Sequence, residues 1–144
     1  MDQPGLEKRM GKESRRISSQ HRQLDALYAL VARALAGADG PEARSCFVRF
    51  CDALEAHFSL EDELYFPALH GMRPALESDL AQLSRDHVGF RQDLLDLNGL
   101  LEAGDLPGCS QRLDGFVRRL AQHEGREEQI LERIQASVAA AGID

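Results

Sequence analysis

The feature that most constrains this chain is an unbroken apolar repeat between residues 76 and 101. Its members recur at alternating steps of three and four residues: Leu76, Leu80, Leu83, His87, Phe90, Leu94, Leu97 and Leu101. That spacing places all of them on one face of an α-helix, and a face sustained over so many turns is typical of a helix bundle. A histidine occupies one of these core positions.

Three further segments carry the same kind of repeat, and glycine and proline separate them. Each break combines a glycine that ends one helix with a proline that opens the next, in residues 37–41, 71–74 and 104–107. The pattern predicts helices at about residues 13–36, 41–69, 74–103 and 107–140, with Pro67 kinking or fraying the last turn of the second. No stretch alternates with the period of two that a strand requires. We therefore expect an all-α fold, an up-down-up-down antiparallel four-helix bundle, as a single domain over residues 1–144 with a flexible arm at residues 1–12.

Composition and charge exclude several classes of protein. The formal net charge of -7 argues against a general nucleic-acid binder. No window approaches about eighteen uninterrupted apolar residues, and the N-terminus lacks the apolar segment of a secretory signal. The 3 cysteines are an odd number without C-x-x-C spacing, so we expect reduced thiols. These features predict a cytoplasmic protein that binds neither membrane nor nucleic acid.

One histidine lies in the apolar pattern of each predicted helix. In antiparallel helices, two residues equally far from the connecting turn lie at the same height, because the rise per residue is the same. The midpoints of successive pairs are residues 39, 72 and 105, each of which falls within a turn. The four histidines are therefore predicted to form one layer: His21, His57, His87 and His123. His70 lies in a turn and is expected to be an ordinary surface residue.

Two glutamates accompany this layer. Glu61 and Glu127 each follow a histidine by four residues, which places both side chains on one helix face. An unpaired, ionised carboxylate in a core is heavily penalised, so two of them beside four neutral imidazoles require a cation. The alternative is a coincidental polar core. Imidazole and carboxylate without thiolate suit iron, manganese or zinc, and six ligands are too many for one tetrahedral zinc ion. Two metal ions bridged by the carboxylates would use all six ligands. In each motif the histidine precedes the glutamate, which is the reverse of the ferritin-like Glu-x-x-His.

With these motifs the chain resembles the hemerythrin-like family, in the branch with the HHE cation-binding domain. The matched pattern covers essentially the whole chain: His21, then His57-x-x-x-Glu61 within HFSLEDELYFPAL, then His87, then His123-x-x-x-Glu127 within HEGREEQIL. The resemblance implies a di-iron centre. The first two histidines would bind one iron and the last two the other, and the two glutamates would bridge them together with an oxo or hydroxo group. It also implies a small ligand: dioxygen, nitric oxide or peroxide.

The chain departs from the pattern of the oxygen-carrying members, which have a fifth histidine on the third helix, four residues from the other. Leu83 and Arg91 stand four residues before and after His87. The carriers also have a bridging Asp five residues after its histidine. Glu128 has that spacing here, but Glu127 repeats the motif of the second helix and is preferred. The missing ligand favours redox turnover or sensing over reversible storage.

Three functions remain open. The leading one is a non-haem di-iron protein that binds or senses dioxygen, nitric oxide or peroxide. The others are a di-iron redox enzyme, with peroxidase, catalase-like or nitric oxide reductase activity, and an iron-dependent regulatory or metal-buffering module with an unidentified protein partner. No catalytic residue and no organic cofactor is assigned. Tyr65 and Tyr28 are expected to be core phenols, with Tyr65 as an alternative hydrogen-bond donor or replacement ligand at the centre.

Overall fold

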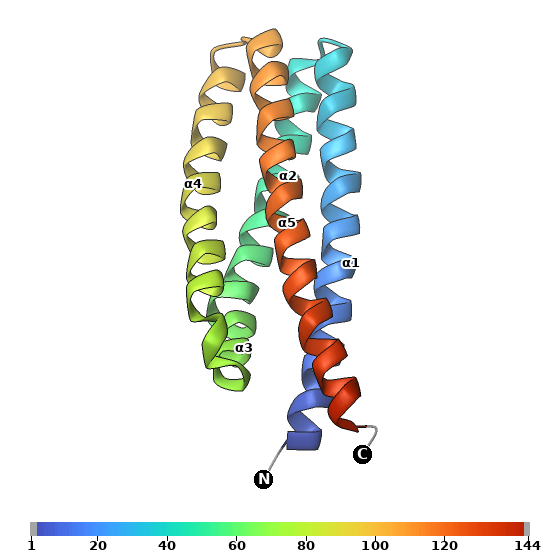
Figure 1. The fold of residues 1–144 in the computed structure, drawn as a ribbon. Coiled ribbons are helices and arrows are strands. Elements are labelled where there is room, and N and C mark those ends of the chain that lie inside the picture. The colour runs from blue at the N-terminus through green and yellow to red at the C-terminus, as the bar shows by residue number, and fades with distance from the viewer. Residues whose placement is uncertain (1–2, 143–144) are drawn as a thin grey trace.

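The computed structural model describes residues 3–142, with side chains for residue 12 and residues 15–136, as a bundle of four long helical segments (Figure 1). The elements in order are α1 (Gln3–Ala36), α2 (Gly40–Leu60), the π-helix η1 (Glu61–Tyr65), α3 (Phe66–Met72), the 3₁₀-helix η2 (Pro74–Leu76), α4 (Glu77–Glu102) and α5 (Leu106–Gly142). None of the described residues lies in a strand. The predicted all-α four-helix bundle is confirmed.

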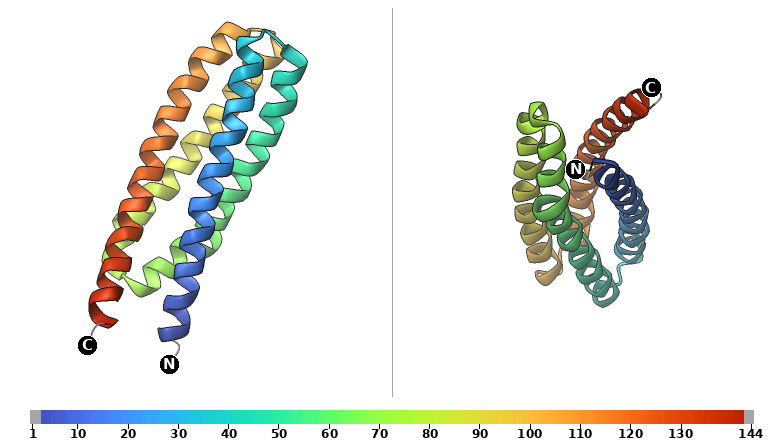
Figure 2. Two further views of the ribbon diagram at one scale, coloured as in Figure 1. Left: turned by 90° about the vertical axis from the view of Figure 1, so that its right-hand side faces the viewer. Right: turned by 90° about the horizontal axis from the view of Figure 1, so that it is seen from below.

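The helices run alternately up and down, so that both ends of the described chain lie at one end of the bundle (Figures 1 and 2). Helix α1 packs against α2 and α5, and α4 packs against α5 and α2. At the first turn, the side chain of Asp39 caps α2 by accepting a hydrogen bond from the backbone N–H of Glu42 at 3.1 Å. At the third turn, Gly104 adopts a φ of 74°, a left-handed conformation that suits the glycine ending a helix.

Helix α1 begins ten residues earlier than the sequence pattern predicts. Its first residue is Gln3, so the part of the expected flexible arm that the structure describes, residues 3–12, is helical. Pro4 and Gly5 fall in the first turn, where a proline needs no N–H partner. The residues that follow are mostly good helix formers, so the helix continues without a break. Residues 1 and 2 lie outside the described residues.

The second helical segment is longer than predicted and contains a local irregularity. It continues to Met72, and its regular α-helix gives way to a π-helix between Glu61 and Tyr65. The backbone N–H of Phe66 bonds to the carbonyl of Glu61, five residues before it. Pro67 explains the irregularity, because it has no N–H and its ring crowds the preceding turn of a regular helix. The disturbance predicted for the last turn therefore lies just before the proline.

The core consists of two apolar clusters, one on either side of the predicted histidine layer. The larger cluster lies toward the first and third turns and includes buried residues of α1 from Leu24 to Leu35. The smaller cluster includes Ile17, Tyr65 and Leu83 and lies toward the second turn. The apolar repeat that defines α4 is buried as predicted from Leu80 to Leu101. No helix built from the described residues is long and apolar enough to cross a membrane.

Candidate metal centre

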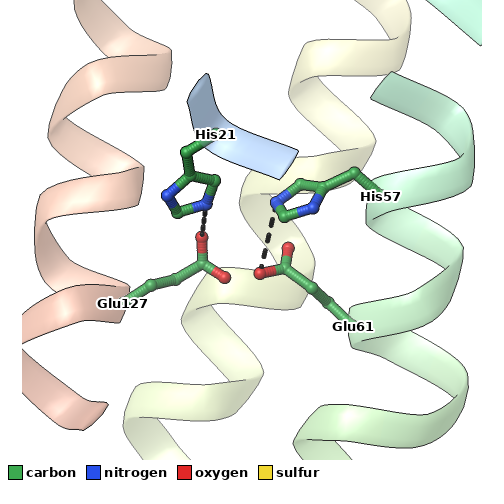
Figure 3. Close-up of side chains that lie close together, drawn as sticks. All are labelled: His21, His57, Glu61 and Glu127. Carbon is green, nitrogen blue, oxygen red and sulfur yellow. Dashed lines mark ion pairs between the residues drawn. The ribbon is translucent and has the colours of Figure 1, made fainter. Parts of the chain in front are cut away.

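Six polar side chains converge between the two apolar clusters. Helix α1 contributes the first histidine, α2 and η1 a histidine and a glutamate, α4 a histidine, and α5 a histidine and a glutamate. All six are at most 6% exposed: His21, His57, Glu61, His87, His123 and Glu127. Figure 3 shows four of them pointing toward one another. The structure thus brings together the four histidines that were predicted to form one layer and the two glutamates that were predicted to accompany it.

Each glutamate lies between two imidazoles. The Oε2 atom of Glu61 lies 3.5 Å from Nε2 of His57, and its Oε1 atom lies 3.0 Å from Nε2 of His87. The Oε1 atom of Glu127 lies 3.5 Å from Nε2 of His21 and 3.6 Å from Nε2 of His123. Each carboxylate therefore lies near two histidines, and Glu61 presents a different oxygen atom to each of its two.

The donor atoms form two groups that could each hold a metal ion. One contains His21 and His57 with both glutamates, and the other contains Glu61 with His87 and His123. Within each group the donor atoms lie within 4.8 Å of one another. This grouping agrees with the histidine pairs that the resemblance implies, and Glu61 belongs to both groups.

The outward nitrogens of the histidines are held by oxygen acceptors. On the α2 side, Nδ1 of His57 donates to the Oε1 atom of Gln20 at 2.6 Å. On α4, Nδ1 of His87 donates to Oδ1 of Asp62 at 3.0 Å. An ionised carboxylate can only accept, so Nδ1 of His87 carries a proton, and Nε2 of the neutral ring would present its lone pair to the centre. This is the arrangement found around metal-binding histidines.

The other two histidines follow the same pattern. Nδ1 of His123 donates to Oδ2 of Asp86 at 2.9 Å, and Nδ1 of His21 contacts Oε1 of Glu128 at 3.4 Å. Glu128 has a side chain that is 53% exposed. The preference for Glu127 over Glu128 as the inward carboxylate therefore agrees with the structure, in which Glu128 supports His21 from outside.

The inward atoms lack ordinary partners. Among the described residues, no hydrogen bond reaches Nε2 of His21, Nε2 of His57 or any of the four carboxylate oxygens of Glu61 and Glu127. The Nε2 atoms of His87 and His123 lie 3.2 Å apart. They are within hydrogen-bonding distance, but with both ring protons on Nδ1 their lone pairs would face each other. Unpaired buried polar groups carry a large cost, and a cation would remove it for all of these atoms at once.

Burial keeps two histidines of the centre in the neutral form that binds metal, whereas at His87 burial is outweighed by Glu61 and Asp62, whose hydrogen bonds and charges raise its pKa. Burial lowers the pKa of His57 to about 3, with the neighbouring imidazoles adding to the effect. It also lowers the pKa of His123 to about 4, against the opposing hydrogen bond to Asp86. Burial raises the pKa of Glu61, so without a cation this carboxyl group resists ionisation. Neutral imidazoles and ionised carboxylates are the ligand forms, so metal binding would favour release of a proton from Glu61.

Three of the acceptors that contact the histidines were not predicted from the sequence: Asp62, Asp86 and Gln20. Each is adjacent in sequence to a predicted site residue. That adjacency was the available signal.

The Tyr28 hydroxyl contacts Asp114 at 3.5 Å on the exposed side, and Tyr65 is buried in the smaller apolar cluster. His70 is exposed, as expected, but it lies within α3 and not in a turn, because the second helical segment continues to Met72. The 3 cysteines form no disulfide.

Comparison with known proteins agrees with this geometry. No curated protein and no solved structure matches the chain significantly. The model of one protein family, described as the hemerythrin HHE cation-binding domain, matches residues 13–134. The match covers all four long helices and every histidine and glutamate of the centre. The chain therefore belongs to the hemerythrin HHE cation-binding domain family.

Proposed function

We propose that this chain is a non-haem di-iron protein that binds or senses dioxygen, nitric oxide or peroxide. His21 and His57 would hold one iron ion, His87 and His123 the other, and Glu61 and Glu127 would bridge them. Iron supplies the redox-active, electron-rich centre to which such small molecules bind.

The observation that carries the proposal is that the two nitrogens of each imidazole face different surroundings. In all four histidines Nδ1 faces an oxygen acceptor, while Nε2 faces the two buried glutamates. A polar core without metal would use the inward atoms for hydrogen bonds among themselves. Here those carboxylate oxygens have no hydrogen-bond partner among the described residues. The acceptors fix the ring orientation and raise the basicity of the inward nitrogen, which are the roles of outer residues around a metal.

Aromatic rings restrict what could reach the centre. The ring of Phe58 stacks on His87 with centroids 4.2 Å apart, and the ring of Phe66 stacks near the same imidazole at 5.8 Å. Phe90 packs edge-on against His123 at 5.3 Å. These rings pack against His87 and His123 and surround both imidazoles with apolar surface. The surroundings therefore support a diatomic molecule or peroxide rather than an organic substrate.

A redox enzyme is the second candidate, and the residue four positions before His87 favours it. That residue is Leu83, a buried side chain without a donor atom. Its position lies one helical turn from His87 on the same face. The adjacent ion would therefore have fewer protein ligands, and more open coordination positions, than in a centre with a histidine at that position. Peroxidase, catalase-like or nitric oxide reductase activity would be measured as turnover of peroxide or nitric oxide. Binding without turnover supports the first candidate.

Metal analysis of the aerobically purified protein tests the proposal, with absorption spectra recorded before and after dithionite and again after readmitting air. We expect about two iron ions per chain, as a bridged two-metal site requires, and visible bands that bleach and return. His87→Ala should lower the iron content, because it removes a buried donor. His70→Ala is the matched control, since His70 is exposed and should leave the content unchanged. Zinc, or no metal, with a flat visible spectrum would contradict the proposal.

A further inference from the structure

A third glutamate reaches the centre from α5. Glu124 directly follows His123, and its side chain is 14% exposed. Its Oε2 atom is buried, has no hydrogen-bond partner among the described residues, and lies 3.7 Å from Nε2 of His21. Glu124 also precedes Glu127 by three residues, so both carboxylates lie on one face of α5.

The surroundings of Glu124 do not supply an ordinary partner for its buried oxygen. The charged groups that act on its carboxyl group include the acidic side chains of Asp25 and Glu128, which repel a second negative charge. One nitrogen close to it is Nε2 of His21, and Nδ1 of the same ring contacts Oε1 of Glu128 at 3.4 Å. With the ring proton on Nδ1, an electron-rich oxygen and an electron-rich nitrogen would face each other at the edge of the centre. A cation between them would be favourable to both.

We propose that Glu124 is an additional protein ligand of the ion held by His21 and His57, an inference that rests on the proposed di-metal function. This ion would then have five protein donors: two imidazoles, the two bridging carboxylates and Glu124. The ion held by His87 and His123 has two imidazoles and the same bridging carboxylates. It therefore keeps more open positions.

The two ions consequently differ in what they can bind. On the face of α4 that carries His87, the residue one turn earlier is Leu83, which cannot coordinate. An external ligand such as azide would bind at the ion between His87 and His123. Glu124 would close the other ion to the same ligand.

Cobalt(II) is the probe that tests this assignment, because its visible spectrum reports the number of ligands whatever the native metal is. The variants are Glu124→Gln, which removes the charged oxygen donor at nearly constant shape, and Glu132→Gln, a control on an exposed glutamate of the same helix. We expect Glu124→Gln to weaken one of the two cobalt-binding steps by at least about tenfold, the lower end of what residues outside the ligand shell contribute. The spectrum of one ion should change to that of a lower coordination number. The control should match the wild type.

Azide titration of the cobalt-loaded proteins adds a readout that a structural role would not move. The wild type should bind azide at one ion, and Glu124→Gln should gain a second azide-binding step at the position it vacates. Glu124→His, which restores a donor atom, should recover cobalt affinity and lose the second step.

Two outcomes separate this inference from the function on which it rests. If the wild type takes up cobalt at two sites and Glu124→Gln matches Glu132→Gln in affinity, spectrum and azide binding, Glu124 is not a ligand, and the proposed centre stands without it. If the wild type takes up no cobalt, the proposed metal centre itself is wrong.

Discussion

The carboxylate of Asp86 offers the most controlled test of how the outer residues contribute to metal binding. Its Oδ2 atom accepts from Nδ1 of His123 at 2.9 Å and pairs with the guanidinium of Arg126. Burial raises the pKa of Asp86, but hydrogen bonds from His123 and Gln82 and the charge of Arg126 outweigh it and hold that pKa below its ordinary value. Asp86 is therefore ionised at neutral pH and increases the electron density of the imidazole.

The perturbation is Asp86→Asn, and the same helix supplies a matched control. Asp93 forms a similar ion pair with Arg119 at 2.8 Å, with exposures of 27% and 55%, against 16% and 53% for Asp86 and Arg126. Both substitutions remove one surface ion pair, which is worth about 0.2–1 kcal/mol. For 144 residues, with an unfolding entropy of about 2.1 cal/mol/K per residue, about 1 kcal/mol corresponds to about 3 °C in Tm. Both variants should therefore lose at most a few degrees.

Metal affinity should separate the two variants. An asparagine can still accept from His123 but carries no charge, so the inward nitrogen becomes a weaker donor. Losing an outer carboxylate typically lowers metal affinity about 10–100-fold, equivalent to about 1.4–2.8 kcal/mol. Competition titration of Fe²⁺ or Co²⁺ against a chromogenic chelator measures the difference, and Asp93→Asn should match the wild type. Equal affinities for the two variants would refute the reasoning that Asp86 acts on the metal through His123.

Three further predictions concern stability. A free metal concentration of about 1,000 times Kd should stabilise the folded protein by about 4 kcal/mol, and chelating the metal should remove that stabilisation. With the unfolding entropy used above, the loss corresponds to roughly 13 °C in Tm, which calorimetry measures. In the metal-free protein, burial lowers the pKa of His57 from its ordinary value of 6.5 to about 3. Between these two pH values the unfolded chain binds a proton at His57 that the folded protein does not bind. The free energy of unfolding should therefore fall as the pH falls from 6.5 toward 3. His57→Gln should flatten that dependence by at most about 1.4 kcal/mol per pH unit in urea titrations, and an unchanged slope would contradict the assignment. Leu97→Ala, at a side chain 1% exposed, should cost about 2–5 kcal/mol, whereas Leu95→Ala, at 67% exposed, should cost little; both should retain the wild-type metal content.

Helical periodicity was sufficient to predict the architecture and the inward residues. One histidine per helix, each equally far from a turn, defines a common layer whatever the details of packing, because the rise per residue is constant. The i, i+4 spacing then fixes where Glu61 and Glu127 point. These are properties of single helices and of their antiparallel order. The burial of all six residues follows from the same pattern.

The residues that periodicity missed depend on how neighbouring helices are rotated. Asp62 and Asp86 lie beside the apolar face, where a side chain can point to solvent or across to the next helix. Asp62 reaches His87 on α4, and Asp86 reaches His123 on α5, in each case across a helix pair. Glu124 lies at a similar flanking position toward α1. The π-helix at Glu61 was also not predicted. A proline indicates that a helix is disturbed, but it does not determine whether the residues before it or after it deviate from regular α-helix.

The buried polar layer divides the hydrophobic core, and this has a consequence for cooperativity. Among the described residues, the cluster toward the first and third turns contains eighteen buried residues, and the cluster toward the second turn contains nine. Without metal, unpaired carboxylates and lone pairs separate them, so the smaller cluster has little apolar contact with the larger one. Regions with few apolar contacts open first. A bound metal would tie all four helices together at this layer. Hydrogen exchange should therefore be faster over residues 66–83 in the metal-free protein than in the loaded one, while residues 43–58 change little. Equal acceleration in both segments would show instead that the bundle opens as one unit.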